Sequence, residues 1–445
     1  MKKHILTFSF ILAATFGYSH FGYAQIPSPA VAQKLPIIIQ GGTIHVGNGT
    51  VIQNGEIRIT NGKLEYIGAS VTDISKATNV DVINAKDKHL YPSLILLNSC
   101  LGLNEVEAVR ATIDHSEVGD FIPHVRSLIA YNTDSEVIPV TRSNGILLAQ
   151  IAPQSGFVCG TSSVVQLDAW NWEDAAYKTD DGVYFNYPSS YNGGGRWEGD
   201  ALMQRDEKIK EQIDKTEAFL QAAEAYSKMA TPTTVNLKLA AMKGLFDGTK
   251  RAYIRVDFAK DIIASIQLLR KYNIKYITVV GGTESPLVTD FLKANNISVI
   301  LNQTFSVPTR IDEDHDAPFK AATQLQQAGI LFSMSYNDEG SVRNLRNLPF
   351  AIGMACGFGL DKEVAVSAIT LNAAKILGIE SKTGSLEVGK DANIVISQGD
   401  ILDMRSNNIT HAFIQGRIVN LDNKQSRLHT KFMEKYKSEK SVERE

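Results

Sequence analysis

The chain has 445 residues, of which 44% are hydrophobic and 21% charged, and its formal net charge at pH 7 is −3. A chain of this length is too long to fold around one small hydrophobic core. The length therefore predicts one barrel-sized domain and a smaller second domain. The composition is ordinary for a globular protein. A slightly negative charge without a basic stripe argues against nucleic acid or an anionic membrane as the main partner.

Residues 1–24 are predicted to be a secretory signal peptide. Residues 1–4 carry positive charge, residues 5–16 are apolar, and small residues surround a cleavage point between Ala24 and Gln25. The apolar run is too short for a membrane span, which needs about 20 residues. No cysteine stands at the cleavage point to accept a lipid. We therefore expect a periplasmic or secreted protein, cleaved near Ala24, with no membrane anchor.

The two ends of the mature chain, residues 25–90 and 384–422, are predicted to pair into one small β-sandwich. Three Asn-Gly pairs separate alternating apolar segments in the first of these regions, a pattern typical of hairpins. Chain termini usually lie close together at a domain surface, so pairing of the two ends is geometrically easy. The Asn-Gly pairs begin at Asn48, Asn54 and Asn61, and the C-terminal β segments are 392–397 and 409–419.

Residues 91–383 are predicted to form a barrel. Strand and helix patterns alternate there, which indicates a parallel sheet, and the number of units fits a (β/α)8 barrel. An irregular segment at 184–199 is either a lid or an insertion, and a long amphipathic helix is predicted at 206–230. Residues 423–445 form a charged tail, either a solvated helix or a frayed end. The clearest strands are predicted at 145–152, 162–167, 253–258, 276–282, 298–303 and 330–335.

Four stretches resemble the amidohydrolase superfamily, especially its exported, imidazolonepropionase-like branch. Residues 92–102 match the first-strand pattern Pro-Gly-Leu-Ile-Asp-x-His-x-His-x-Gly in register, and residues 367–397 match the Thr-x-Asn-x-Ala helix with its following Gly-Ser-Leu-x-x-Gly-Lys turn. Residues 155–174 and 344–357 resemble the exported branch in particular. The resemblance implies a TIM-like barrel with a composite β-sandwich, and a hydrolase of non-peptide C–N bonds that binds one or two divalent metals such as zinc.

The positions that hold the family's metal are substituted in this chain. Such a metal lowers the pKa of its bound water toward ~7 and polarises the substrate carbonyl. The resemblance places its ligands at the carboxyl ends of barrel strands. Asn98 and Cys100 replace the two first-strand histidines, Asp257 replaces the fifth-strand histidine, and Gly281 replaces the sixth.

The eighth-strand aspartate position reads Asn337, or Asp338 after a one-residue shift. Carboxylate and amide oxygens suit calcium or magnesium, and a thiolate suits zinc. This mixture supplies no standard three-ligand catalytic site, so we expect no metal cofactor. The polar residues predicted to line the cavity are Asn98, Cys100, Asp257, Glu284 and Asn337, and the candidate catalytic residues are Asp257 and Asp338.

None of the nine histidines is expected at a strand end that faces the barrel mouth. His315 lies in the acidic segment 312–316, which could be a calcium loop or a solvated loop. The segment lacks the glycine turn and trailing glutamate of an EF-hand, which favours the solvated loop.

Three functions remain open. The first is a degenerate, non-catalytic subunit, in a homo-oligomer or in a hetero-oligomer with an intact amidohydrolase relative. The second is a hydrolase of C–N bonds with a site remodelled around Asp257 and Asp338. The third is a small-molecule binding protein that uses the barrel mouth. The missing ligands favour the first, although fold alone cannot choose. Candidate interface elements, rich in aromatic residues, are Trp170, Trp172, the loop 184–199 and the helix 206–230.

Overall fold

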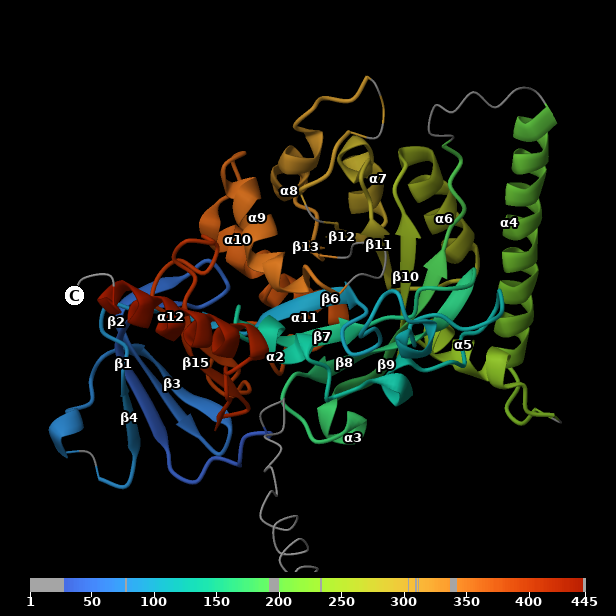
Figure 1. Cartoon of the computed structure of the whole chain (residues 1–445). Coiled ribbons are helices and arrows are strands. Elements are labelled where there is room, and N and C mark those ends of the chain that lie inside the picture. Colours follow the sequence, from blue (N-terminus) through green and yellow to red (C-terminus); the bar gives the residue numbers. More distant parts are fainter. Residues whose placement is uncertain are drawn as a thin grey trace, which may run out of the picture.

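The computed structural model describes residues 28–76, 78–191, 200–232, 234–302, 304–308, 310, 312–336 and 342–442 (Figure 1). The predicted signal peptide at 1–24 and the candidate residues Asn337 and Asp338 lie outside the described residues. Among the helices that are described, none combines the length and the apolar character needed to cross a membrane.

One of the two sheets is built from both ends of the chain, as predicted. Its order is β16-β15-β14-β5-β1-β2-β3, with β4 also paired to β1. The two ends join where β14 runs antiparallel to β5 and Val395 lies opposite Tyr91. The chain passes into the other sheet at Ser93, directly after β5. The strands are β1 (Ile37–His45), β2 (Val51–Thr60), β3 (Lys63–Ala69), β4 (Asp81–Asn84), β5 (His89–Pro92), β14 (Ile394–Ser397), β15 (Ile409–Ile414) and β16 (Arg417–Ile418).

Two of the three Asn-Gly pairs form the predicted hairpins. Asn61 has φ +50° in the turn between β2 and β3, and Asn48 lies between β1 and β2. The third hairpin was predicted wrongly, because Asn54 lies inside β2 with φ +48°. Its neighbour Gly55 faces Gly42, where the register of β1 shifts. A positive φ at this point therefore accommodates a bulge instead of reversing the chain.

The other sheet is a nearly closed barrel whose eight strands follow chain order from β6 to β13 (Figure 1). Ile95 of β6 donates its backbone N–H to Ile369 O, in the segment just before α11. Together with the first sheet, this confirms the predicted barrel and composite sandwich. The strands are β6 (Leu94–Ser99), β7 (Ile146–Ile151), β8 (Val158–Gln166), β9 (Ala176–Asn186), β10 (Arg251–Val256), β11 (Ile277–Gly281), β12 (Ser298–Leu301) and β13 (Phe332–Met334).

The expectation of a wholly parallel barrel was wrong for β8. This strand runs antiparallel to both β7 and β9, with Ala149 opposite Val165. The connection from β7 to β8 contains only residues 152–157 and no helix. A connection this short suits antiparallel neighbours, whereas parallel neighbours need a crossover of a dozen or more residues.

Helices cover the outside of the barrel (Figure 1), and the last helix of the chain follows the C-terminal strand of the first sheet. The predicted helix at 206–230 is α4, which buries Leu220, Ala223 and Tyr226. The predicted loop at 184–199 begins later than expected, because β9 continues to Asn186; residues 192–199 lie outside the description. The α helices are α2 (Val137–Arg142), α3 (Trp172–Ala175), α4 (Asp200–Ser227), α5 (Leu237–Asp247), α6 (Ala259–Lys271), α7 (Thr289–Ala294), α8 (Ala317–Ala328), α9 (Leu348–Cys356), α10 (Lys362–Ala368), α11 (Leu371–Leu377) and α12 (Lys424–Val442). The 3₁₀ helices are η1 (Ile74–Lys76), η2 (Arg110–Thr112), η3 (Ser127–Ala130), η4 (Ser285–Val288) and η5 (Leu345–Asn347).

Candidate functional site

Arg255, near the carboxyl end of β10, organises the barrel mouth. Its Nε and Nη2 donate to Asn98 Oδ1 at 3.3 and 2.9 Å. Nη2 also donates to Pro153 O at 2.8 Å, and Nη1 donates to Asn186 Oδ1 at 3.1 Å. The guanidinium carbon lies 4.4 Å from the centre of the Tyr184 ring. All three guanidinium nitrogens therefore have partners, and a fixed positive charge lies where four strands or their following loops converge.

Asn98 is held at the end of β6 in an unusual backbone conformation. Its φ is +49°, a region that asparagine tolerates better than most residues. The side chain is buried, with 1% exposure, and the backbone N–H donates to Gln150 Oε1 at 3.2 Å. This geometry places the amide oxygen against Arg255.

A polar network fills the barrel beneath the mouth. Asp181 Oδ2 accepts hydrogen bonds from Gln150 Nε2 at 2.9 Å and from Tyr253 OH at 2.7 Å. Its Oδ1 accepts from Ser162 Oγ at 2.8 Å, and Tyr184 OH donates to Gln150 Oε1 at 2.8 Å. Burial raises the pKa of Asp181. The interior is therefore packed with mutually satisfied polar groups.

Cys100, at the second histidine position, is a poor metal ligand in this structure. Burial raises the pKa of its thiol to about 12, although Arg255 acts in the opposite direction. In the metal-free chain the thiol is therefore protonated at neutral pH, and a metal ion could bind it only by displacing that proton beside the positive charge of Arg255. The cysteines at 100, 159 and 356 are all free.

Asp257 and Glu284 form contacts of their own beside the mouth. Asp257 Oδ1 accepts from Thr283 Oγ1 at 2.9 Å. Glu284 Oε2 accepts from the backbone N–H of Ala259 at 2.8 Å, and its Oε1 pairs with Arg310 Nε at 2.8 Å. Because Ala259 is the first residue of α6, Glu284 satisfies one of the N–H groups that a helix start leaves open. Its contacts are those of a helix cap.

Gly281, at the sixth-strand ligand position, leaves no room for a side chain. Its φ is +93°, and a Cβ atom built there would lie 2.6 Å from Asp257 Oδ1. A histidine at this position is therefore incompatible with the observed backbone and with Asp257.

The residues at the mouth do not fit the divalent metal that the resemblance implies. The amide oxygen of Asn98 is engaged by a cation, the thiol of Cys100 is protonated, and position 281 has no side chain. A divalent ion would also face the positive charge of Arg255. Two unit charges of equal sign 4 Å apart repel by about 4 kcal/mol near a protein surface.

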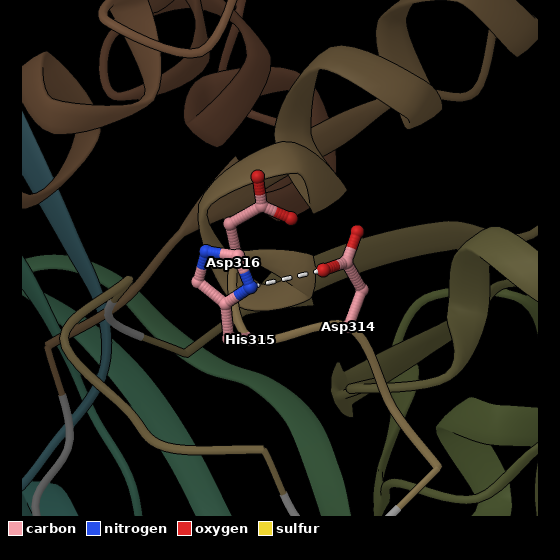
Figure 2. Close-up of side chains that lie close together, drawn as sticks. All are labelled: Asp314, His315 and Asp316. Atoms are coloured by element: carbon pink, nitrogen blue, oxygen red, sulfur yellow. Dashed lines mark ion pairs between the residues drawn. The ribbon is translucent and has the colours of Figure 1, made fainter.

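A possible cation-binding group elsewhere in the described chain is Asp314, His315 and Asp316, whose ligand atoms lie within 4.8 Å of one another (Figure 2). His315 Nδ1 lies 3.2 Å from Asp314 Oδ1, and the histidine side chain is 90% exposed. Lys320 Nζ already pairs with Asp314 at 3.3 Å and with Asp316 at 2.7 Å. A cation would have to compete with this ammonium group, so the arrangement is that of an ion-paired surface loop.

Sequence reasoning missed Arg255 and His115. Arg255 lies two residues before Asp257, and the alternation of a strand places it on one face with Tyr253 and Asp257. This alternation is the signal that could have identified Arg255. Burial and then the charge of Arg255 lower the pKa of His115, which lies in the connection between β6 and β7 and at no strand end, so the expectation for the histidines is not contradicted. His115 and His124 line a cavity of about 400 Å³ between the segments that follow β6 and β7. No sequence signal singled out His115, because it lies in a long irregular segment.

The two tryptophans occupy different environments. Trp170 is 68% exposed, whereas Trp172 opens α3 and packs partly buried against the main core. Asn171 caps α3 by accepting from Asp174 N. Trp170 therefore lies before a short capped helix and is largely exposed, whereas Trp172 is partly covered by the core.

The sequence profile of the Amidohydrolase family matches residues 205–419. A curated relative from Flavobacterium psychrophilum named imidazolonepropionase is 24% identical over 169 residues, covering 34% of this chain and 41% of the relative. A relative of the same name from Symbiobacterium thermophilum is 35% identical over 82 residues, covering 18% of this chain and 19% of the relative. The matched regions therefore span less than half the length of these relatives.

Solved structures share the fold over nearly the whole described chain. An amidohydrolase from Thermotoga maritima superposes with a TM-score of 0.74 at 20% identity, covering 86% of this chain and 99% of that one. A molinate hydrolase superposes with a TM-score of 0.53 at 13% identity, covering 88% and 96%. The profile match and the relatives support membership of the amidohydrolase superfamily, and the solved structures show that the chain shares its fold.

Proposed function

We propose that this chain is a metal-free member of the superfamily that acts as a non-catalytic subunit or binding protein. The observation that carries the proposal is Arg255, whose guanidinium binds Asn98 where the resemblance expects a metal-binding histidine. A permanent cation in this position supplies charge and hydrogen-bond donors. It cannot bind and activate a water molecule as a metal does.

A hydrolase with a remodelled site is the second candidate, favoured by the names of the relatives. Two of them are called imidazolonepropionase, and several structural neighbours are called hydrolases. The reaction would use Asp257 and Asp338 on a non-peptide C–N bond. Asp257 accepts from Thr283 and Asp338 lies outside the described residues. The contacts of Asp257 thus provide no activated nucleophile, which favours the first candidate.

Metal analysis of the purified full chain tests the choice. We expect far less than one equivalent of zinc, manganese or iron, because a site without its ligands loses most of a binding free energy of order 10 kcal/mol. The matched variants are Asp257→Ala and Asp290→Ala, the second removing an exposed carboxylate on α7. One metal per chain that is lost in Asp257→Ala and kept in Asp290→Ala would overturn the proposal in favour of the remodelled hydrolase.

Export and partnership are part of the same proposal. The charged, apolar and small-residue segments at 1–24 support cleavage near Ala24 and a periplasmic or secreted location. The exposed Trp170 and the outer face of α4 support assembly with an intact amidohydrolase relative or with a second copy of the chain.

A further inference from the structure

A second cavity lies at the end of the barrel opposite the mouth. It has a volume of about 160 Å³ and is lined by residues from three separate segments, among them Ser28, Tyr131, Arg142, Asp168 and Trp170. Because β8 is antiparallel, its last residue, Gln166, pairs with Leu148 near the start of β7. The segment 166–170 therefore lies where the parallel strands begin, away from Arg255.

Two arginines share one carboxylate beside this cavity. Asp168 Oδ1 accepts from Arg142 Nη1 at 2.8 Å, and Asp168 Oδ2 accepts from Arg417 Nη1 at 2.8 Å. The side chains of Arg142 and Asp168 are only 3% and 1% exposed, and that of Arg417 is 17% exposed. The buried group therefore carries one positive charge in excess. Asp134, which also lines the cavity, is exposed at its rim, where water screens its charge.

One edge of the Arg142 guanidinium has no partner among the described residues. Its Nε and Nη2 are buried and make no hydrogen bond, and the same holds for the hydroxyl of Tyr131, a residue that is 5% exposed. Nε and Nη2 point in the same direction and form the fork with which arginine binds two oxygens of a carboxylate or phosphate. Leaving such donors unsatisfied in a buried position is costly.

We propose that this cavity binds a small oxyanion, held by the Nε–Nη2 edge of Arg142 and by the Tyr131 hydroxyl. The volume corresponds to about five water molecules at some 30 Å³ each, enough for a carboxylate or an inorganic oxyanion. The excess positive charge selects an anion over a cation. Since Arg417 belongs to β16 and Arg142 to α2, the bound anion stabilises the junction between the composite sandwich and the barrel.

Thermal unfolding of the full chain tests the site. Acetate and phosphate are titrated separately at constant ionic strength, with chloride as the balancing anion. We expect a saturable rise in Tm with at least one of them; acetate alone identifies a carboxylate ligand, and phosphate alone identifies an inorganic oxyanion. The variants are Arg142→Lys, which keeps the charge but loses the fork, Tyr131→Phe, and Tyr66→Phe as a control whose hydroxyl bonds Ala69 O elsewhere.

Arg142→Lys should lower the affinity for the anion by about tenfold or more, because two charge-assisted hydrogen bonds are lost. Tyr131→Phe should lower this affinity severalfold, and Tyr66→Phe should respond like the wild type. If Arg142→Lys does not fold, Tyr131→Phe decides alone. Crystals soaked in selenate should show anomalous density within hydrogen-bond distance of Arg142 Nε and Nη2. Equal Tm shifts in every variant, no shift at all, or only water in the cavity would overturn the proposal.

Discussion

At the scale of single residues, Arg255 shows how a positive charge can be stabilised without a carboxylate. Within the described chain its hydrogen bonds go to the neutral oxygens of Asn98, Pro153 and Asn186 and to the Cys159 sulfur, and its plane packs on Tyr184. Amide dipoles and an aromatic face both favour a cation. The same acceptors would become unsatisfied if the arginine were removed.

We expect Arg255→Met to lower the free energy of unfolding by about 2–4 kcal/mol, because each buried acceptor left without a donor costs about 1–3 kcal/mol. Urea denaturation followed by circular dichroism measures the change. The control is Arg405→Met, which removes an exposed pair with Asp403 and should leave the midpoint unchanged. Equal midpoints for the two variants would show that the Arg255 contacts contribute nothing to stability.

A second group of residues couples the two domains through histidines. His45 Nδ1 lies 2.7 Å from Glu363 Oε1 of α10, and His45 Nε2 lies 3.0 Å from His89 Nδ1 of β5. Burial, followed by the charge of His45, lowers the pKa of His89. If His45 donates to Glu363, its Nε2 accepts from His89, and a proton added between the two rings breaks that hydrogen bond.

The lowered pKa of His89 predicts a loss of stability in acid. Its folded pKa is below the unfolded value of about 6.5, so the unfolded chain binds more protons as the pH falls below 6.5. The stability contributed by neutral His89 is therefore present above pH 6.5 and lost as the pH falls through the folded pKa. We expect His89→Gln to lose less unfolding free energy than the wild type between pH 7.5 and 5.5. The control His315→Gln, at an exposed site, should follow the wild type; identical slopes for all three proteins would contradict the assignment.

At the scale of elements, alternation and turn signals predicted the sheets better than their strand directions. Short apolar runs located β7 and β10 to β13 within a few residues. The residues of β8 are all buried. The apolar pattern of such a strand is the same whether it runs parallel or antiparallel to its neighbours. The direction follows from the length of its connections, which an apolar pattern does not encode. Asn54-Gly55 likewise suggested a hairpin turn, because the pair alone does not show whether a positive φ reverses the chain or forms a bulge.

The pairing of β14 with β5 makes the N-terminal sheet dependent on the C-terminal strands. Ending the chain after Gly384 removes β14 to β16 and exposes the backbone groups of Leu90 and Tyr91. We expect a lower Tm and faster amide hydrogen exchange in β1 and β5. The control ends after Asn423 and removes α12, whose residues 424–437 are all exposed; it should melt like the full chain. If the chain that ends after Gly384 keeps the Tm and the amide protection of the full chain, this dependence is contradicted.

At the scale of the whole molecule, the family resemblance located the barrel and the polar strand ends, but not the group that replaces the metal. Asn98 and Cys100 were identified because their positions align with a motif, and the structure places both near Arg255. Asp257 contacts Thr283, and Glu284 contacts Arg310 and the start of α6; that both line the same cavity stays a prediction. Which polar groups meet depends on side-chain directions that the motif does not specify.

Assembly with an intact relative is the whole-molecule prediction. The chain recovered from the periplasmic fraction should begin near Gln25 and co-elute with the relative in size-exclusion chromatography after co-expression. Trp170→Ser should weaken co-elution, because an exposed aromatic side chain contributes strongly when an interface buries it. The control is Val118→Ser, at a position 92% exposed on another segment. Separate elution at micromolar concentration, with the relative's turnover unchanged, would leave ligand binding at the barrel mouth as the remaining role.

The reversed direction of β8 also bears on the order in which the chain can fold. β7, β8 and β9 follow one another through connections of six and nine residues, so their pairing closes only short loops and loses little chain entropy. The parallel pair β6 and β7, by contrast, can form only when the long segment between residues 99 and 146 closes into a loop. This meander can therefore assemble before the β6–β7 pair forms, and it offers a template on which the later parallel strands add in sequence.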